Sequence, residues 1–252
     1  MPSKQSGGEA GAYASQRYKR GLRRWRRRIR TRLLLVLAPF VLPALYLEYT
    51  DPHLWHWLGG VMMGMALGLW AWVRDTPPPY VEAWQRGHEG ETKTAAELAR
   101  LPGSWRVFHD IQTGRGNYDH IAVGPAGVFL LESKNPRGRL VVHDGRPQLT
   151  FALDDERVWD FGAAAGQAIA SARELRGYIR DTTRFTQFVQ AVVVVWCDFP
   201  AGVHRLDSCT FVHGKELRAW LEAQPATIAD MHVDRCADAI GALTRGATAR
   251  AA

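Results

Sequence analysis

The sequence has few cysteines and, after residue 73, almost no net charge. Its three cysteines, Cys197, Cys209 and Cys236, form no pattern typical of a disulfide framework or a metal site, which favours reduced thiols. The net charge of +7 is concentrated in residues 1–32, which carry eleven Lys or Arg against one acid, whereas residues 74–252 sum to −1. The basic composition therefore indicates no DNA-binding groove in the larger part of the chain.

Charged residues are also missing from two long stretches. Residues 33–47 are all apolar, and residues 54–73 contain only His56 as a polar side chain, with Trp pairs near both ends. This pattern predicts two transmembrane helices, at about 33–49 and 54–73. A cleaved signal peptide is disfavoured, because a second apolar run follows and the first lacks a small-residue cleavage site.

The position of the positive charge predicts an orientation for this transmembrane hairpin. Residues 17–32 carry ten Lys or Arg and the connection 48–53 carries none, so we expect a multi-pass plasma-membrane protein with both termini cytoplasmic. Gly60, Gly64 and Gly68 lie four residues apart, a spacing that allows close helix pairing within or between chains.

The remaining segments predict the domain organisation. Residues 1–32 are expected to form a disordered basic tail, with the two membrane spans within residues 33–73. A Pro-rich linker follows at 74–83, then one domain at 84–223, and then a weak helical tail at 224–252.

The pattern within the domain predicts an α/β fold, with a mixed β-sheet flanked by helices. The expected strands include a hairpin whose turn is Gly124–Gly127, and a strand at 189–197 so apolar that both its faces should be buried. The other expected elements are helices at 92–101 and 160–180, a first strand at 105–111, and two short strands at the edge of the sheet, 140–142 and 148–151.

Polar residues occur at the ends of the two hairpin strands. Asp119 lies at the start of the first strand, and Glu132 and Lys134 end the second, where a period of two places them on one face. Two carboxylates can hold a hard divalent cation such as Mg²⁺, and the lysine is placed to contact a phosphate or an attacking water. A buried Glu–Lys ion pair beside a solvated Asp explains the same pattern without a metal.

Two further polar residues lie on the expected helices. Glu91 shares a helix face with Ala95 and Leu98, so that its carboxylate either faces the core or merely favours the positive end of the helix. Gln167 borders the apolar stripe of helix 160–180, where an ordinary flanking polar residue is also expected.

Residues 84–200 resemble the nuclease-related domain called NERD, a branch of the PD-(D/E)xK nuclease-like fold. The matching pieces are GHEGE at 87–91, NYDHIAVGPAGVF at 117–129 and LESKN at 131–135. The resemblance implies a restriction-endonuclease-like core with Asp119 and Glu132 as ligands of Mg²⁺ or Mn²⁺ and Lys134 as the catalytic lysine. It further implies Glu91 as an auxiliary acid and Gln167 as the polar residue of the later helix.

Two functions follow as hypotheses. The first is a membrane-tethered, metal-dependent nuclease that cleaves phosphodiester bonds of DNA or RNA in the cytoplasm. The second is a non-catalytic, membrane-anchored module that binds nucleic acid or a protein on a nuclease-like fold. The five polar residues motivate the first hypothesis, and the near-neutral domain motivates the second.

Overall fold

The computed structural model describes residues 4–7, 12–50, 56–75, 79–113, 116–151 and 154–251. The chain divides into two compact units. The first comprises Ser15–Gln85, and the second comprises Met1–Ala14 together with Arg86–Ala252. The candidate site residues all belong to the second unit, the α/β unit.

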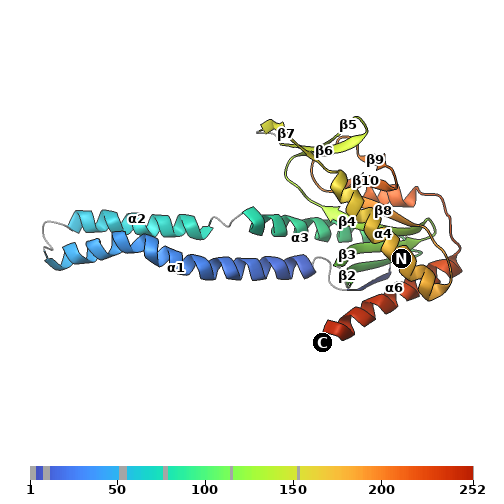
Figure 1. Ribbon diagram of the computed structural model, residues 1–252, viewed down its shortest axis with the longest axis horizontal. Coiled ribbons are helices and arrows are strands. Elements are labelled where there is room, and N and C mark those ends of the chain that lie inside the picture. The colour runs from blue at the N-terminus through green and yellow to red at the C-terminus, as the bar shows by residue number, and fades with distance from the viewer. Residues whose placement is uncertain are drawn as a thin grey trace. The chain divides into compact units, whose positions relative to one another are not determined.

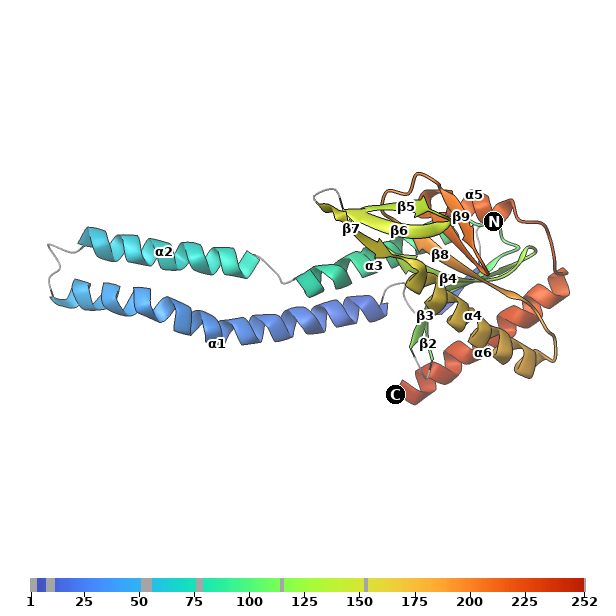
Figure 2. The same ribbon diagram turned by 45° about the horizontal axis from the view of Figure 1, so that its top comes forward.

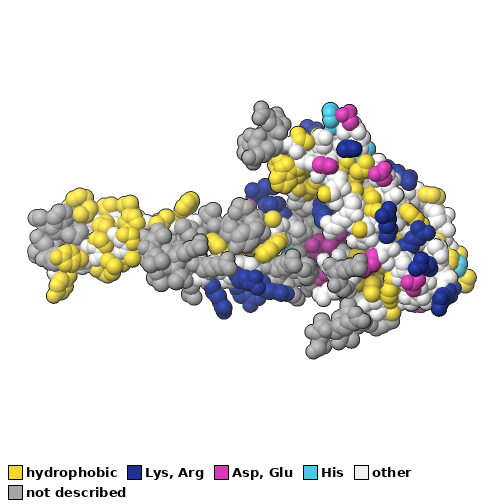
Figure 3. Space-filling model, in the orientation of Figure 1, with side chains coloured by type: hydrophobic (Ala, Val, Ile, Leu, Met, Phe, Trp, Pro, Cys, Tyr) yellow, Lys and Arg dark blue, Asp and Glu magenta, His cyan; other side chains and the backbone are white. Residues whose placement is uncertain are grey.

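The unit of residues 15–85 is helical. It contains most of helix α1 (Ala12–Thr50), all of helix α2 (His56–Asp75) and the start of helix α3 (Pro79–Leu98). Figure 3 shows apolar side chains along the described parts of α1 and α2, in yellow, and basic side chains on α1, in dark blue. The large apolar side chains exposed on these two helices are Leu42, Leu45, Tyr46, Tyr49, Trp57, Val61, Met65, Leu67, Trp70 and Trp72.

Across the described residues, we find no helix with the length and apolar character needed to cross a membrane. This finding contradicts the predicted multi-pass membrane location with cytoplasmic termini, and it leaves the predicted transmembrane hairpin at 33–49 and 54–73 without support. The apolar run of residues 33–49 is part of one 39-residue helix that also contains the Arg-rich run 17–32. The connection at 51–55 lies outside the described residues.

The three glycines of α2 face open space. A Cβ atom added at Gly60, Gly64 or Gly68 would meet nothing within 4 Å. Helix pairing through this stripe therefore stays a prediction.

The α/β unit is built on a mixed sheet of seven strands in the order β1-β2-β3-β4-β8-β10-β9 (Figure 1). The β1–β2, β4–β8 and β8–β10 pairs are parallel, and the β2–β3, β3–β4 and β9–β10 pairs are antiparallel. The predicted α/β class with a mixed sheet and flanking helices is thus confirmed. The strands are β1 (Lys4–Gly7), β2 (Arg106–Gln112), β3 (Asn117–Gly124), β4 (Gly127–Lys134), β8 (Val189–Val195), β9 (Val203–Leu206) and β10 (Cys209–His213).

Helices cover both faces of this sheet (Figure 2). Helices α4 (Gly162–Thr183) and α6 (Asp230–Ala251) pack on one face, where Leu175 and Cys236 are fully buried. The carboxyl-terminal part of α3 and helix α5 (Leu217–Glu222), which follows a 3₁₀ turn at Gly214–Glu216, pack on the other face. Strand β8 lies between these layers, so its Val-rich sequence is buried on both sides as predicted.

The strands after β4 depart from the prediction. Strands β5 (Arg139–His143), β6 (Arg146–Phe151) and β7 (Asp154–Asp160) form a separate three-stranded sheet instead of extending the main one. In the main sheet, β4 pairs with β3 on one side and β8 on the other, and the edge strands are β1 and β9. The two sheets are linked by the Leu140 N–H, which donates to the Asp198 carbonyl at 2.7 Å.

The β3–β4 hairpin has the turn that its sequence predicts. Gly124 pairs with Gly127, whose φ of 131° favours glycine. Gly124 is needed for a different reason, because a Cβ there would lie 2.3 Å from the Trp105 ring. The hairpin that carries the candidate site is thus fixed by a close contact between backbone and indole.

We therefore expect Gly124→Ala to destabilise the protein by about 1–3 kcal/mol, since overpacking a buried site forces backbone or ring to shift. Gly177→Ala in α4 is the matched control, because its Cβ would meet nothing within 4 Å. It should stabilise the helix by up to about 1 kcal/mol. Denaturant unfolding of both variants measures the difference, and equal midpoints would contradict the role of this contact.

Candidate active site

Asp119 and Glu132 are brought together by the register of the hairpin. His120 pairs with Leu131, and continuing this register places Asp119 beside Glu132. The Ser133 N–H donates to Oδ2 of Asp119 at 2.9 Å. The two acidic residues predicted as metal ligands therefore lie on adjacent strands at one end of the hairpin.

Glu132, Lys134 and Gln167 form a contact cluster across the space between β4 and α4. Lys134 Nζ and Gln167 Nε2 each donate to Oε1 of Glu132 at 2.8 Å. Lys134 Nζ also lies 3.5 Å from Oε1 of Gln167. Because the Glu132 side chain is only 7% exposed, its charge depends on these two donors in place of water.

The neighbouring residues of β4 point to the opposite face and hold α3. Ser133 Oγ donates to Thr94 Oγ1 at 2.8 Å, and Trp196 Nε1 donates to the same oxygen at 2.8 Å. Thr94 in turn donates to the Gly90 carbonyl at 3.0 Å, which uses the full hydrogen-bonding capacity of the hydroxyl. Side chains of the Glu-Ser-Lys segment therefore point alternately to the two faces of β4. Glu132 and Lys134 belong to the cluster, whereas Ser133 anchors α3.

Gly90 lets α3 approach the strand ends closely. A Cβ at this position would lie 3.0 Å from Cβ of Asn135 and 3.7 Å from the Trp196 ring. The Asn135 side chain also donates to the Arg86 carbonyl at 3.1 Å. These contacts fix the turn of helix that carries Glu91 next to the strand ends.

The carboxylates influence one another electrostatically. Burial, followed by the charges of Asp110 and Glu132, raises the pKa of Glu91 to about 7, and Lys134 opposes this shift. Burial and then the charges of Glu132 and Glu91 raise the pKa of Asp119 well above its usual range, against the Ser133 hydrogen bond and Lys134. Burial and mutual repulsion thus both oppose ionising all of these carboxyl groups together, and Lys134 offsets this only in part.

Asp110 is a fourth acidic residue that the sequence analysis did not single out. It lies on β2, opposite Asp119 in the strand register, and accepts a hydrogen bond from Asn117 Nδ2 at 3.2 Å. Its φ of 48° interrupts the otherwise regular pairing of β2 with β3. In the sequence, Asp110 could have been noticed as a carboxylate within an otherwise apolar strand. Its spacing from Glu91 along the chain, however, does not show that the two residues lie near each other.

The His109–His120 pair lies beside these acids in sequence but is buried away from solvent. The two Nδ1 atoms are 2.8 Å apart, and the residues are 5% and 0% exposed. Burial lowers the pKa of His109 to about 4, and burial together with His109 lowers that of His120. Both rings are therefore neutral at pH 7 and form part of the core.

The donor set at the hairpin end fits a hard divalent cation with few protein ligands. In the described part of the chain, no group of three or more His, Cys, Asp or Glu side chains is arranged to hold a metal. Mg²⁺ commonly binds through one or two carboxylates and keeps several waters. Asp119 and Glu132 satisfy that requirement, since the hydrogen bonds described above use one oxygen of each carboxylate.

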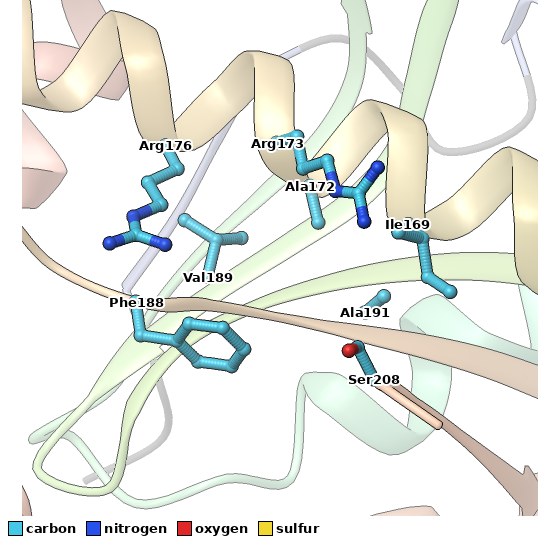
Figure 4. Close-up of a pocket in the computed structure, with 8 residues that line it drawn as sticks. All are labelled: Ile169, Ala172, Arg173, Arg176, Phe188, Val189, Ala191 and Ser208. Carbon is cyan, nitrogen blue, oxygen red and sulfur yellow. The ribbon is translucent and has the colours of Figure 1, made fainter. Parts of the chain in front are cut away.

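A separate pocket of about 230 Å³ lies at the other end of β8 (Figure 4). Arg173 and Arg176 of α4 lie along its rim, and the Arg176 guanidinium is 5.8 Å from the centre of the Phe188 ring. Because Val189 of this pocket pairs with Val128, it lies at the opposite end of β4 from Lys134. It contains none of the predicted site residues.

Comparison with known proteins supports the resemblance of the site region. Residues 86–196 match the family model NERD, the nuclease-related domain. This match includes α3 from Arg86, the hairpin, Gln167 and Trp196. Neither the curated proteins nor the solved structures gave a match.

The Thr94 network gives a first prediction about this site. Thr94→Val should lower the free energy of unfolding by about 1–3 kcal/mol, because one buried donor, on Ser133, and one half-buried donor, on Trp196, lose their acceptor. Thr92→Val is the matched control, since Thr92 also bonds one helical turn back, to the His88 carbonyl, but is exposed. Its effect should stay within about 0.5 kcal/mol. Thermal melts giving equal losses would contradict the anchoring role of Thr94.

Glu91 gives a second prediction, about pH. Because its folded-state pKa is raised from 4.5 to about 7, the folded state binds the proton more tightly than the unfolded state does. Ionisation therefore costs stability as pH rises from about 4.5 to about 7. Relative to wild type, Glu91→Gln should gain stability across this range in chelator. A difference curve that is flat with pH would contradict the assigned burial of Glu91.

Proposed function

We propose that the α/β unit is a metal-dependent nuclease, which hydrolyses phosphodiester bonds of DNA or RNA on a PD-(D/E)xK-type core. The observation that carries the proposal is the Glu132–Lys134–Gln167 cluster with Asp119 beside it. The match of residues 86–196 to the nuclease-related domain supports the same reaction class.

Asp119 and Glu132 would hold Mg²⁺ or Mn²⁺ in this proposal. The bound ion would supply a Lewis acid for the phosphate and a lower pKa for a bound water. Burial first, and then the charges of Glu132 and Glu91, raise the pKa of Asp119, so a bound cation would stabilise its ionised form.

Lys134 is assigned to the phosphate. Its ammonium is held by Glu132 and Gln167 at the end of β4, where it can donate to a non-bridging oxygen or position the attacking water. Gln167 orients both partners, because its amide nitrogen donates to Glu132 and its amide oxygen faces Lys134. Glu91, with a pKa of about 7, is suited to proton transfer near neutral pH.

A non-catalytic binding module is the second candidate. The specific observation in its favour is the 2.8 Å ion pair between Glu132 and Lys134, since a buried ion pair can be purely structural. The two functions differ in what Lys134→Met should do.

If the nuclease proposal holds, Lys134→Met should lower cleavage of labelled DNA or RNA at least about 100-fold, the range of a lost proton-transfer or positioning group. The rise in melting temperature on adding Mg²⁺ should persist, because lysine is not a ligand. Asp119→Asn should instead remove that rise.

The matched control is Arg173→Met, which removes an exposed cation from α4 and should leave cleavage unchanged. If the ion pair is only structural, Lys134→Met should lose about 3–5 kcal/mol of stability, because a buried carboxylate is left unpaired. That loss, combined with a wild type that does not respond to Mg²⁺, would refute the nuclease.

A further inference from the structure

A second hollow lies at the same end of β4 as Lys134, on the other side of β4 from Gln167. Its volume is about 640 Å³, within the range of sites that enclose small ligands. It begins where β4 and β8 end, because Lys134 pairs with Val195 and the Trp196 N–H donates to the Lys134 carbonyl at 2.9 Å. The wall includes Lys93, Trp196, Asp198, His213, Lys215 and Glu216.

The indole of Trp196 is held rigidly at the wall of this hollow. Its Nε1 donates to Thr94, which is fully buried in α3. On another side it packs on Gly214, where a Cβ atom would lie 2.4 Å from the ring. The residue is nevertheless only half-buried. Trp196 is thus a fixed aromatic surface that remains partly open to solvent.

Cationic side chains accompany the ring. Lys93 Nζ lies 5.7 Å from the ring centre, and Lys215 is an exposed cation in the same wall. Two acidic residues also line the wall. Asp198 forms an ion pair with Arg139 at 3.1 Å, so Glu216 is the acid whose charge counts against those of Lys93 and Lys215. An aromatic surface with positive side chains is the combination that binds unpaired nucleotides.

We propose that this hollow binds one unpaired nucleotide of single-stranded nucleic acid, next to the phosphate that Lys134 contacts. The base stacks on Trp196, and the flanking phosphates contact Lys93 and Lys215. This inference rests on the proposed nuclease function and adds a substrate class to it. A base inside a duplex has both faces covered by neighbouring base pairs, so the hollow favours single strands.

The test is binding of a fluorescein-labelled 12-nucleotide oligothymidylate to the full-length chain, followed by anisotropy over a range of salt concentrations. All proteins carry Lys134→Met to prevent cleavage. Replacing both Lys93 and Lys215 by Ala should weaken binding at least about fivefold and reduce the slope of log affinity against log salt by about 1.4, from ~0.7 per lost phosphate contact. Arg235→Ala removes an exposed cation from α6 and should change neither quantity.

The stacking surface is tested by two substitutions of Trp196. Trp196→Leu should weaken binding about 5- to 150-fold, the effect of losing one base–aromatic stack at 1–3 kcal/mol, and Trp196→Phe should retain most of the affinity. If Trp196→Leu fails to fold, the lysine double variant still decides the question. The matching 12-base-pair duplex should bind more weakly than the single strand.

The proposal is overturned if the lysine double variant has the affinity and salt slope of Arg235→Ala, or if duplex binds as tightly as single strand. Cleavage by the chain with native Lys134 separates this outcome from the proposed function. If the oligonucleotide binds as predicted but no Mg²⁺-dependent cleavage is measured, the nuclease proposal is refuted and the nucleotide-site proposal stands. Cleavage that is unaffected by the lysine and Trp196 variants refutes the nucleotide site and retains the nuclease.

Discussion

The candidate site depends on the balance of charge at the end of one hairpin. Asp119, Glu132 and Glu91 influence one another there, and Asp110 adds to the charge near Glu91. Lys134 is the ammonium that opposes the shifts of Glu91 and Asp119, and it bonds directly to Glu132. Burial first, and then this excess of negative charge, raises the pKa of Glu91 and of Asp119, so both groups retain protons more readily than free carboxyl groups do. The same excess is the physical reason for proposing a divalent cation.

The second constraint is the close docking of α3 on the strand ends. One hydroxyl, that of Thr94, joins β4 through Ser133, β8 through the following Trp196, and its own helix through Gly90. This network places Glu91 near the hairpin end and also fixes the indole that walls the proposed nucleotide site. The groups proposed for catalysis and for nucleotide binding therefore share one rigid support, which would favour precise geometry for the proposed reaction.

Short-range patterns in the sequence predicted the parts of the fold governed by local chemistry. The Gly-Pro turn and apolar runs predicted the β3–β4 hairpin, and the continuous Val run predicted the buried β8. The predicted proximity of Asp119, Glu132 and Lys134 followed from the alternation of side chains along the two hairpin strands, and the structure places them together. Gln167 lay at the border of an apolar helix stripe, and only the packing of α4 on β4 shows that it contacts Glu132 and Lys134.

Features set by long-range packing were missed. Thr94 and Trp196 are 102 residues apart, and Asp110 reaches the site through an unusual backbone angle, so neither follows from local periodicity. The strands predicted at 140–142 and 148–151 were placed at the edge of the main sheet, but they correspond to β5 and β6 of a separate sheet, and β7 was not predicted. The membrane prediction rested on the two apolar runs alone, and the structure places the first of them in one helix with the Arg-rich run.

The most direct test of the charge balance is calorimetry of Mg²⁺ or Mn²⁺ binding at pH 7 in buffers of different ionisation enthalpy. If Asp119 and Glu132 hold the ion and it replaces retained protons, binding should release protons, and the observed heat should vary with the buffer. Asp119→Asn should lose most of the binding. Absence of binding in the wild type, or binding with no proton release and unchanged in Asp119→Asn, would contradict the account.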